Sequence, residues 1–395
     1  IIKNCQFLNN TVSYNGGAIS FGGYSDCSIS NSIFSGNSAG SYGGAIASAG
    51  ANLRLYNCVF DSNYSSGEGG ALQLNSSFDV RNCIFYKNYT TFPTVIGPGG
   101  AIYSDRGDGP IYNCTFINNS SAYKYSDGGG AIHLTTNFSI PIKNCIFRGN
   151  SSGGVTTGSG TDFSIENAYY AAANSLLQAK HGYNETNDLY NVDPLFIDTL
   201  HPKGPDGRWL TADDGLQLTY YSPLVNYGDN ASVGTAVDAL GENRIVGGTV
   251  DPGAYEFQDK PLALAGVDTL LCNGDSLKIG RGGDPAFSYS WTSLPAGFVS
   301  SALMPEIRPA VPTRYFLSVT DGTTTSKDTV DITMTSSVTP LVNISTDSTG
   351  VCQGINTVFT ASTVYGGDSV GYQWQVNGVN VGGDSSRFLT RTLSD

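Results

Sequence analysis

The sequence has few charged residues and no long apolar run. Charged residues make up only 13% of the 395 positions, and the net charge of -13 comes from 33 acidic and 20 basic side chains. The basic residues do not cluster, which argues against a nucleic-acid or anionic-membrane partner. No stretch approaches the roughly 20 apolar residues that a membrane helix needs, so we expect no direct membrane insertion by this chain.

Glycine is abundant, at 50 residues, but it follows no strict third-position repeat. That pattern excludes a collagen triple helix and favours turn-rich β structure. The chain also lacks the basic segment and apolar core of a signal peptide. Because it begins inside a repeat and ends inside a partial copy of another unit, we expect a fragment of a longer protein.

Two short motifs alternate along the first 150 residues. One has the form Asn-Cys-x-Phe-x-x-Asn, and the other is Gly-Gly-Ala-Ile or Gly-Gly-Ala-Leu. The first begins at Asn4, Asn31, Asn57, Asn82, Asn113 and Asn144, with Ser32 in place of cysteine in one copy; the second begins at Gly16, Gly43, Gly69, Gly99 and Gly129. Their common period of 25 to 31 residues indicates a repeat architecture.

Local periodicity favours strands over helices within each repeat. Apolar and polar side chains alternate from Phe78 to Arg81, and the alternation restarts out of phase after Asn82. Asparagine tolerates the left-handed conformation, so each motif asparagine is predicted to form a corner between two strands. The Gly-Gly pair is predicted to turn the chain into the next strand. Each repeat is therefore predicted to form one coil of a parallel β-helix.

Stacking the coils about 4.8 Å apart would align like residues into columns. The expected inward columns are Cys5, Cys58, Cys83, Cys114 and Cys145, and Phe7, Phe34, Phe60, Phe85, Phe116 and Phe147. A polar column at a turn would contain Asn10, Asn37, Asn63, Asn88, Asn119 and Asn150. The regular spacing favours buried free thiols; disulfides between neighbouring coils are the alternative.

The paired motifs resemble the repeats of chlamydial polymorphic membrane proteins and related bacterial β-helix surface proteins. The resemblance covers about residues 1–150 and implies a right-handed, pectin-lyase-like parallel β-helix with an adhesive role. Between about 160 and 257, the phrases at 191–196, 214–218, 222–229 and 251–256 resemble the choice-of-anchor Q module of bacterial β-helix proteins. We expect this module to cap the last open coil, because exposed sheet edges invite aggregation. The predicted first domain spans 1–257.

One stretch of this module, residues 204–215, carries Asp206, Asp213 and Asp214 around glycine turns. A calcium ion takes six to eight oxygen ligands and can organise such a loop, although the spacing is not that of an EF-hand. The three aspartates are therefore candidate calcium ligands, and calcium is the one cofactor that the sequence suggests. The alternative is a solvated turn in which they accept backbone hydrogen bonds.

After residue 257 the composition changes to short alternating strands, as in β-sandwiches. Cys272 and Trp291 recur as Cys352 and Trp374. The pattern resembles immunoglobulin-like and polycystic-kidney-disease-like modules of Bacteroidetes secreted proteins, which predicts one domain at 258–337 and a second, truncated one at 338–395. Triplets such as Asp268-Thr269-Leu270, Asp275-Ser276-Leu277, Asp328-Thr329-Val330 and Asp368-Ser369-Val370 resemble the O-glycosylation acceptor of those proteins.

Parallel β-helices also include polysaccharide lyases and glycoside hydrolases, which need a base or two carboxylates at the scissile bond. The one compact ionisable cluster in the coils runs from Asp105 to Asp108, and a solvated loop explains it as well. The three histidines are isolated, without metal-ligand spacing: His133, His181 and His201. Several tyrosines in or near turns could stack on sugars: Tyr24, Tyr42, Tyr103, Tyr123 and Tyr125.

We therefore expect an extracellular, cell-surface protein of a Bacteroidetes-type bacterium, secreted by the type IX route. It would act without catalysis as an extended scaffold for adhesion or for contact with host, cell-surface or polysaccharide glycans. Further immunoglobulin-like domains of the same chain are its expected neighbours. The rival hypothesis is a polysaccharide lyase or glycoside hydrolase of the parallel β-helix type.

Overall fold

The computed structural model describes residues 1–23, 25–91, 99–122, 128–135, 139–157, 161–165, 169–181, 184–335, 341–347, 356–364 and 370–390. These residues form an all-β protein whose one helical element is the short 3-10 turn η1, Asn230–Ser232. The chain divides into two compact units, residues 1–268, 278–307 and 313–331 in one, and 269–277, 308–312 and 332–395 in the other. None of the described segments forms a helix long and apolar enough to span a membrane.

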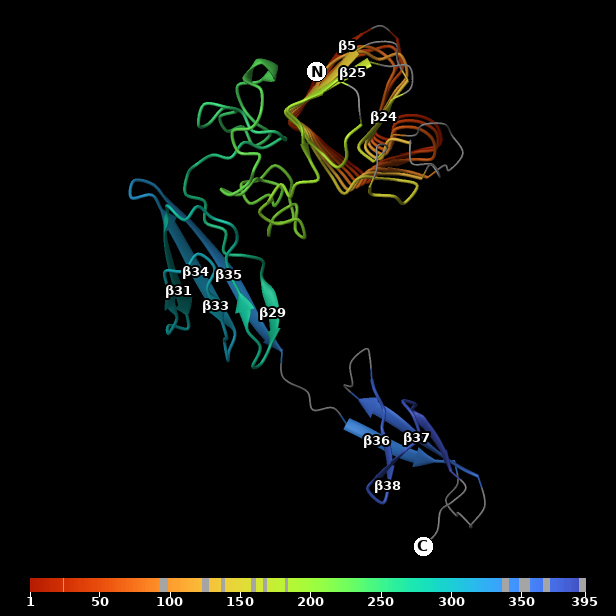
Figure 1. Ribbon diagram of the computed structural model, residues 1–395, viewed down its shortest axis with the longest axis vertical. Helices are drawn as coiled ribbons and strands as arrows, with labels where there is room; N and C mark the ends of the chain where they lie inside the picture. The colour runs from red at the N-terminus through yellow and green to blue at the C-terminus, as the bar shows by residue number, and fades with distance from the viewer. Residues whose placement is uncertain are drawn as a thin grey trace. The chain divides into compact units, whose positions relative to one another are not determined.

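The coils of the β-helix contribute to four parallel sheets, seen nearly end-on in Figure 1. Sheet 1 contains β1 (Ile2–Lys3), β5 (Asp26–Ser30), β9 (Asn52–Tyr56), β13 (Phe78–Arg81), β17 (Ile111–Tyr112), β21 (Ser139–Lys143), β25 (Tyr169–Ala173) and β27 (Glu185–Thr186). Sheet 2 contains β2 (Gln6–Leu8), β6 (Ile33–Ser35), β10 (Val59–Asp61), β14 (Ile84–Tyr86), β18 (Thr115–Ile117), β22 (Ile146–Arg148), β26 (Leu176–Leu177) and β28 (Leu189–Tyr190).

Sheets 3 and 4 have six strands each. Sheet 3 contains β3 (Thr11–Val12), β7 (Ser38–Ala39), β11 (Tyr64–Ser65), β15 (Tyr89–Thr90), β19 (Ser120–Ser121) and β23 (Ser151–Ser152). Sheet 4 contains β4 (Ile19–Phe21), β8 (Ile46–Ser48), β12 (Leu72–Leu74), β16 (Ile102–Ser104), β20 (Ile132–Leu134) and β24 (Phe163–Ile165). The first six coils thus pass through sheets 1 to 4 in order, which confirms the predicted parallel β-helix.

The corner between sheets 1 and 2 is an asparagine in the left-handed conformation, as predicted. The backbone φ lies between 49° and 55° at Asn4, Asn31, Asn57, Asn82, Asn113, Asn144 and Asn174. The glycine pair before sheet 4 is also explained by its geometry, because Gly43 has a φ of 60°. A Cβ atom at Gly44 would collide with the carbonyl oxygen of Gly70 in the next coil.

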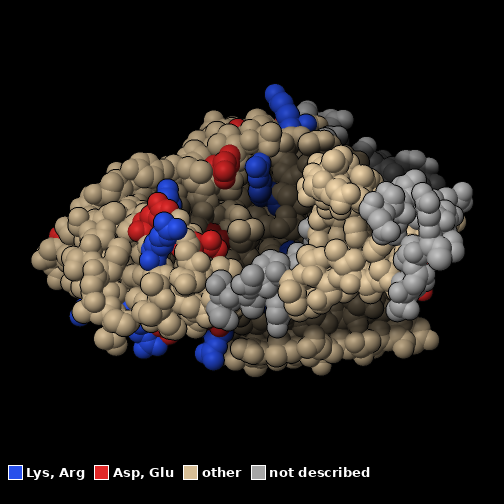
Figure 2. Space-filling view, turned by 90° about the horizontal axis from the view of Figure 1, so that it is seen from below, with Lys and Arg blue, Asp and Glu red and all other residues tan. Residues whose placement is uncertain are grey.

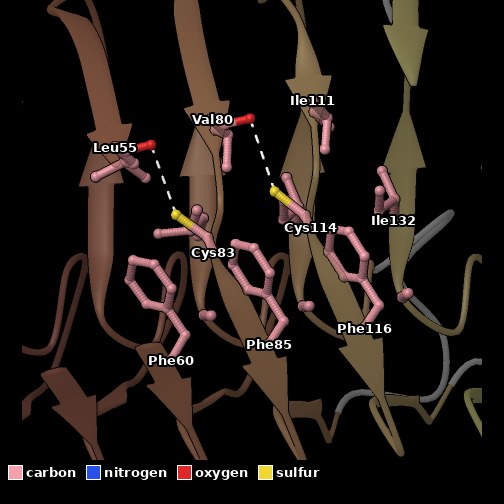
Figure 3. Close-up of a cluster of buried hydrophobic side chains, with 14 of the residues drawn as sticks. Leu55, Phe60, Val80, Cys83, Phe85, Ile111, Cys114, Phe116 and Ile132 are labelled. Atoms are coloured by element: carbon pink, nitrogen blue, oxygen red, sulfur yellow. Dashed lines mark hydrogen bonds between the residues drawn. The ribbon is translucent and has the colours of Figure 1, made fainter. Parts of the chain in front are cut away.

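The interior contains the predicted columns of phenylalanine and cysteine (Figure 3). Successive phenylalanine rings from Phe7 to Phe147 stack with centroids 4.7 to 5.0 Å apart. Cys83 Sγ donates to Leu55 O at 3.5 Å, and Cys114 Sγ donates to Val80 O at 3.7 Å. The described cysteines are free thiols. The cysteines of the interior column therefore act as small buried groups that donate to carbonyl oxygens, although Cys5 in the first coil is only partly buried.

The predicted asparagine column at the turn after sheet 2 is confirmed, and its inner members are fully buried. Asn63 donates from its backbone N and from Nδ2 to Asn88 Oδ1, at 3.0 and 2.9 Å. Its Nδ2 also donates to Phe34 O at 2.9 Å, while its Oδ1 accepts from Asn37. The same pattern runs from Asn10 to Asn150, so each amide satisfies both its own hydrogen-bonding groups and those of its neighbours.

The segment after the coils packs along their side. The sequence had suggested instead that it caps the open end of the last coil. Its apolar residues form a second core with the outward side chains of sheet 2, such as Ile84, Ile117 and Ile146. Trp209 Nε1 donates to Asp61 Oδ2 at 3.0 Å in this core. The outer face of sheet 2 is apolar, so it needs a lateral cover, and the irregular chain of 192–257 supplies that cover.

The same segment also binds the corner asparagines. Asn82 Nδ2 donates to Thr235 Oγ1 at 2.8 Å, and Asn144 Nδ2 donates to Asp229 O at 3.1 Å. Asp229 N donates back to Asn144 Oδ1 at 2.8 Å. The corner between sheets 1 and 2 therefore provides a row of amide groups to which the irregular segment is fixed, and this contact buries Asn82 and Asn144.

The C-terminal strands form sheets consistent with immunoglobulin-like domains. They are β29 (Thr269–Cys272), β30 (Leu277–Lys278), β31 (Ser288–Leu294), β32 (Val299–Ser300), β33 (Glu306–Ile307), β34 (Thr313–Thr320) and β35 (Thr325–Thr335), then β36 (Leu341–Thr346), β37 (Thr357–Val364), β38 (Trp374–Val376), β39 (Val379–Val381) and β40 (Arg387–Thr390). In the first predicted sandwich domain, β31 pairs antiparallel with β32 and β34. In the second predicted sandwich domain, β37 pairs antiparallel with β36 and β40.

The two tryptophans that suggested sandwich cores differ in burial. Trp291 is fully buried and donates from Nε1 to Ala302 O at 3.0 Å. Trp374 is only partly buried and stacks on Phe388, with ring centroids 5.6 Å apart. Cys272 is exposed, so it is not part of a core. Cys352 lies outside the described residues, and the boundaries 258–337 and 338–395 stay predictions.

Replacing one buried amide of the asparagine column should destabilise the coils. We expect Asn88→Ala to lower the free energy of unfolding by about 3 kcal/mol, because it removes the hydrogen-bond partner of Phe60 O, of Asn63 N and of one of the two N–H groups of Asn63 Nδ2. Asn52→Ala is the matched control, since Asn52 is exposed and should cost less than about 0.5 kcal/mol. Urea unfolding followed by circular dichroism measures both, and equal midpoints would contradict a structural role for the column.

Candidate functional site

Two of the three candidate calcium ligands lie at the surface and take part in turn hydrogen bonds. Asp206 Oδ1 accepts from Arg208 N at 2.7 Å, and Asp213 Oδ2 accepts from Asp206 N at 3.3 Å. Asp206 is exposed and Asp213 is partly exposed. Each carboxylate therefore stabilises the backbone of the 204–215 loop, which is the role that the solvated-turn alternative assigns to it.

Asp214, the third candidate, points into the protein. It is fully buried, and its Oδ2 accepts from Leu210 N at 2.8 Å and from the hydroxyl of Tyr255. Burial raises the pKa of Asp214 to about 7. Among the described residues, no three His, Cys, Asp or Glu side chains are grouped so that they could hold a metal ion. The calcium site stays a prediction from the sequence, and the hydrogen bonds account for the loop without it.

The lateral segment contains a further buried set of charges that the sequence did not reveal. The guanidinium of Arg244 donates to the carbonyl oxygens of Asp251 and Gly253, at 2.6 and 2.7 Å. Burial raises the pKa of Asp251 to about 6 and that of Glu256 to about 8, with the charge of Asp251 adding to the shift of Glu256. These groups are enclosed and bind backbone atoms, so they hold the segment together.

The two carboxylates of the Asp105 to Asp108 cluster form hydrogen bonds with different neighbouring coils. Asp105 Oδ1 accepts from Thr135 Oγ1 at 3.2 Å, in the next coil. Asp108 Oδ1 accepts from Ser77 Oγ at 2.6 Å, in the preceding coil. Arg106 has a φ of 72° and projects into solvent, with 84% of its side chain exposed. The two carboxylates are thus engaged by different coils.

Asp105 instead lies beside a group of residues on the outer face of sheet 4. Burial raises the pKa of Glu68 to about 7, the negative charge of Asp105 raises it further, and a hydrogen bond from Tyr103 opposes the shift. Burial also raises the pKa of Tyr103 to about 12, against a hydrogen bond from Thr135 and with the charges of Glu68 and Asp105 in support. Glu68, Tyr103, Asp105 and Thr135 therefore interact with one another.

His133 is the unusual member of this face. Its side chain is completely buried, and neither ring nitrogen has a hydrogen-bond partner. Its ring is parallel to that of Tyr103, one coil away, with centroids 5.8 Å apart. Burial lowers the pKa of His133 to about 4, so the imidazole is neutral at physiological pH. A buried polar group without a partner is rare in native proteins.

Sequence reasoning singled out Asp105 and Tyr103 but treated His133 as isolated and passed over Glu68. A signal was present, because both residues occupy variable positions beside a fixed motif. Glu68 directly precedes Gly-Gly-Ala-Leu, and His133 follows Gly-Gly-Ala-Ile. Tyr42 is exposed and forms a parallel β-bridge with Glu68.

The other candidate residues are placed as follows. His181 Nε2 lies 3.5 Å from Asp162 Oδ2, and His201 Nδ1 lies 2.8 Å from Asp198 Oδ2, so both imidazoles have a carboxylate partner. Tyr24, Tyr123 and Tyr125 lie outside the described residues.

The buried carboxyl of Asp214 should make folding depend on pH. Its folded pKa of about 7 exceeds the unfolded value of about 4, so the folded state retains a proton that the unfolded state releases, and stability falls as pH rises from about 4 through 7. We expect Asp214→Asn to reduce the loss of stability between pH 5 and pH 8 by on the order of 1 kcal/mol. Asp213→Asn is the matched control. Urea unfolding at both pH values measures this loss. If the free energy of unfolding changes equally between pH 5 and pH 8 in the wild type and in Asp214→Asn, the raised pKa of Asp214 is contradicted.

Comparison with known proteins supports the architecture. Residues 2–170 match the family model described as right handed beta helix region. The probable autotransporter YfaL of Escherichia coli (strain K12) is 42% identical over 93 residues, which are 21% of this chain and 7% of that protein. The chain thus matches only a small part of that relative. These similarities and the four-sheet coils identify the N-terminal region as a right-handed parallel β-helix of a kind that fits a surface protein.

Proposed function

We propose that this chain is part of an extracellular, cell-surface protein of a Bacteroidetes-type bacterium, where it serves as a non-catalytic scaffold for adhesion. The β-helix would hold variable outward side chains at fixed positions, and contact with glycans of a host, a neighbouring cell or a polysaccharide would involve several of them at once. The similarity to a probable autotransporter supports surface display.

The observation that carries this proposal is that stacking accounts for the recurring residues. The phenylalanines and cysteines fill the interior, the corner asparagines supply positive φ angles, and the second asparagine of each motif forms the buried amide column. The recurring residues therefore maintain the coil. Specific contacts would come from the outward residues that differ from coil to coil.

The exposed surface is compatible with contact to neutral partners. On the face shown in Figure 2, charged side chains are sparse, and several blue and red groups lie next to each other. Ion pairs of this kind join Lys203 Nζ to Asp61 Oδ2 and Arg81 Nε to Asp79 Oδ1, each at 2.6 Å. Neither pair leaves a strong field of one sign, which favours hydrogen bonding and stacking over charge attraction.

The finer features of the proposal rest on the sequence. The choice-of-anchor Q phrases support export and anchoring in the manner of Bacteroidetes surface proteins, including the type IX route. Ser276 and Thr329, the hydroxyl residues of two O-glycosylation triplets, are exposed. Glycosylation at these positions would be sterically accessible. The triplet at Asp368 lies outside the described residues.

The purified chain should adhere to a surface without changing it chemically. We expect beads coated with the chain to bind saturably to epithelial or bacterial cells. Incubation with pectin, alginate or glycosaminoglycans should release no new unsaturated or reducing ends. Beads coated with heat-unfolded chain are the control for nonspecific adhesion.

The rival hypothesis, a carbohydrate-active enzyme, predicts a different result of this incubation. If unsaturated or reducing ends form, and if Asp105→Asn or Asp108→Asn abolishes them while Asp26→Asn does not, the scaffold proposal is wrong. Asp26 is a suitable control because it is an exposed carboxylate on sheet 1. Absence of saturable adherence to every cell type would equally contradict the adhesive role.

A further inference from the structure

The first compact unit contains a cavity of about 90 Å³ beside the lateral segment. One wall is formed by residues between Ile197 and Leu262, and the other by residues between Gly282 and Tyr289. A cavity needs about 10 to 15 Å³ to hold one water molecule, so this one has room for a small organic group. Tyr220, which lines the cavity, is 43% exposed, so a ligand can reach it from solvent.

Aromatic side chains contribute to both walls of this cavity, which we call the aromatic cavity. They are Tyr220, Phe257, Phe287 and Tyr289. The rings of Tyr220 and Phe257 have centroids 6.2 Å apart and are inclined to each other by 62°. Rings inclined in this way can contact one bound group from two sides. Because the face of an aromatic ring carries partial negative charge, a cavity with several such rings favours a cation.

A buried carboxylate adds negative charge to the same cavity. Asp284 lines it and is only 5% exposed. Its Oδ1 accepts from Ala286 N at 2.7 Å, and no donor among the described residues binds its Oδ2. Burial raises the pKa of Tyr289 to about 12, and the charge of Asp284 adds to this shift. The negative charge therefore acts on an aromatic wall of the cavity and would stabilise a bound cation.

The basic side chains near the aromatic cavity are already paired. Lys260 Nζ lies 2.7 Å from Glu242 Oε1, and both residues line the cavity. Arg281, next to one wall, has its Nη1 at 2.6 Å from Asp198 Oδ2. Among the described residues, neither Asp284 nor the exposed lining residue at position 259, also an aspartate, belongs to an ion pair. The cavity therefore has an excess of negative charge.

Hydrogen bonds next to the cavity connect its two walls. Gly280 N donates to Ala265 O at 2.8 Å, and Arg281 N donates to Leu264 O at 3.0 Å. The ion pair between Arg281 and Asp198 is largely buried, since the two side chains are 11% and 15% exposed. The walls are thus held in place before a ligand arrives, which lowers the entropic cost of binding.

We propose that the aromatic cavity binds a trimethylammonium group, the head group that choline carries. The aromatic rings would contact its methyl groups through cation–π interactions, and the carboxylates of Asp259 and Asp284 would offset its charge. This inference goes beyond the proposed function, because adhesion through the coils does not require a site on the lateral segment.

A trimethylammonium group matches the lining better than other small groups do. An unmethylated ammonium is strongly hydrated and would lose hydrogen bonds that apolar walls do not replace. An uncharged apolar group would fill the space without attraction to the rings and carboxylates. An anion would be repelled by Asp259 and Asp284. Methylated ammonium alone among these groups combines positive charge with an apolar surface.

Isothermal titration calorimetry with the whole chain tests the proposal. The probes are choline, tetramethylammonium, ethanolamine with its unmethylated ammonium, and dimethylbutanol, the uncharged carbon analogue of choline. We expect choline and tetramethylammonium to bind at least about tenfold more tightly than ethanolamine and dimethylbutanol, because the other two lack either the methyl groups or the charge.

Substitutions in the lining separate the effect of charge from that of shape. Tyr220→Leu and Phe287→Leu should each weaken choline binding about fivefold, because leucine keeps apolar bulk and removes the aromatic ring. Asp284→Asn should weaken it about tenfold and leave dimethylbutanol binding within about twofold, because asparagine keeps the acceptor for Ala286 N and removes the charge.

Two controls lie outside the cavity. Tyr14→Leu and Asp26→Asn change an exposed ring and an exposed carboxylate in the coils and should leave choline affinity within about twofold of the wild type. Thermal unfolding followed by circular dichroism checks the fold of each variant. Tyr220 is exposed, so Tyr220→Leu keeps the test valid if Asp284→Asn does not fold.

A trimethylammonium group can be part of a free molecule or of a lipid. Cosedimentation with phosphatidylcholine vesicles distinguishes these sources, with phosphatidylglycerol vesicles as the control. Binding to the phosphatidylcholine vesicles alone would assign the site to a lipid head group, and choline binding without vesicle binding would assign it to a soluble ligand.

Three results would overturn the inference. The first is that neither choline nor tetramethylammonium binds. The second is that dimethylbutanol or ethanolamine binds as tightly as choline, which would mean that the cavity selects for apolar bulk or for charge alone. The third is that Tyr220→Leu, Phe287→Leu and Asp284→Asn, when folded, bind choline as the wild type does.

Discussion

The buried asparagine column is the interaction on which the coil stack depends. A turn inside a solenoid leaves backbone N–H and C=O groups that no strand pairs, and burial makes each unsatisfied group costly. Asn63 and its equivalents satisfy these groups by binding the next amide in the column and a phenylalanine carbonyl. Because each amide needs one above and one below, the turn fixes the register of successive coils, and the phenylalanine rings then stack at nearly constant separation.

The first asparagine of each motif, which forms the corner between sheets 1 and 2, has a different role: it binds a segment outside the coils. The corner asparagines adopt positive φ angles, which directs their side chains to the edge between sheets 1 and 2. Asn82 and Asn144 donate from there to the lateral segment, next to the apolar core that this segment forms with sheet 2. One repeated motif thus stabilises the coil through its last asparagine and binds a non-repetitive segment through its first.

The sequence predicted those parts of the structure that repetition determines. Coil corners, interior columns and the asparagine column follow from the period, since like residues in register must meet. The lateral packing of 192–257 could not be predicted, because Trp209 and Asp61 contact each other across 148 residues without any periodic signal. The residues on the outer side of sheet 4 were recognised only in part: Tyr103 and Asp105 were noted, whereas His133 was placed beside Tyr103 only by the strand register, and Glu68 only by its interaction with Tyr103.

The direction of the hydrogen bonds has a mechanical consequence. In the coils, the backbone bonds of all four sheets and the amide bonds of the asparagine column run between successive coils, along the stacking axis. Tension along that axis would therefore load the bonds of one interface in parallel, and separation would require many of them to break at once. The hydrogen bonds of the asparagine column would bear part of this force at the turn, where no strand pairing links the coils. A protein under shear at a cell surface would benefit from that distribution of force.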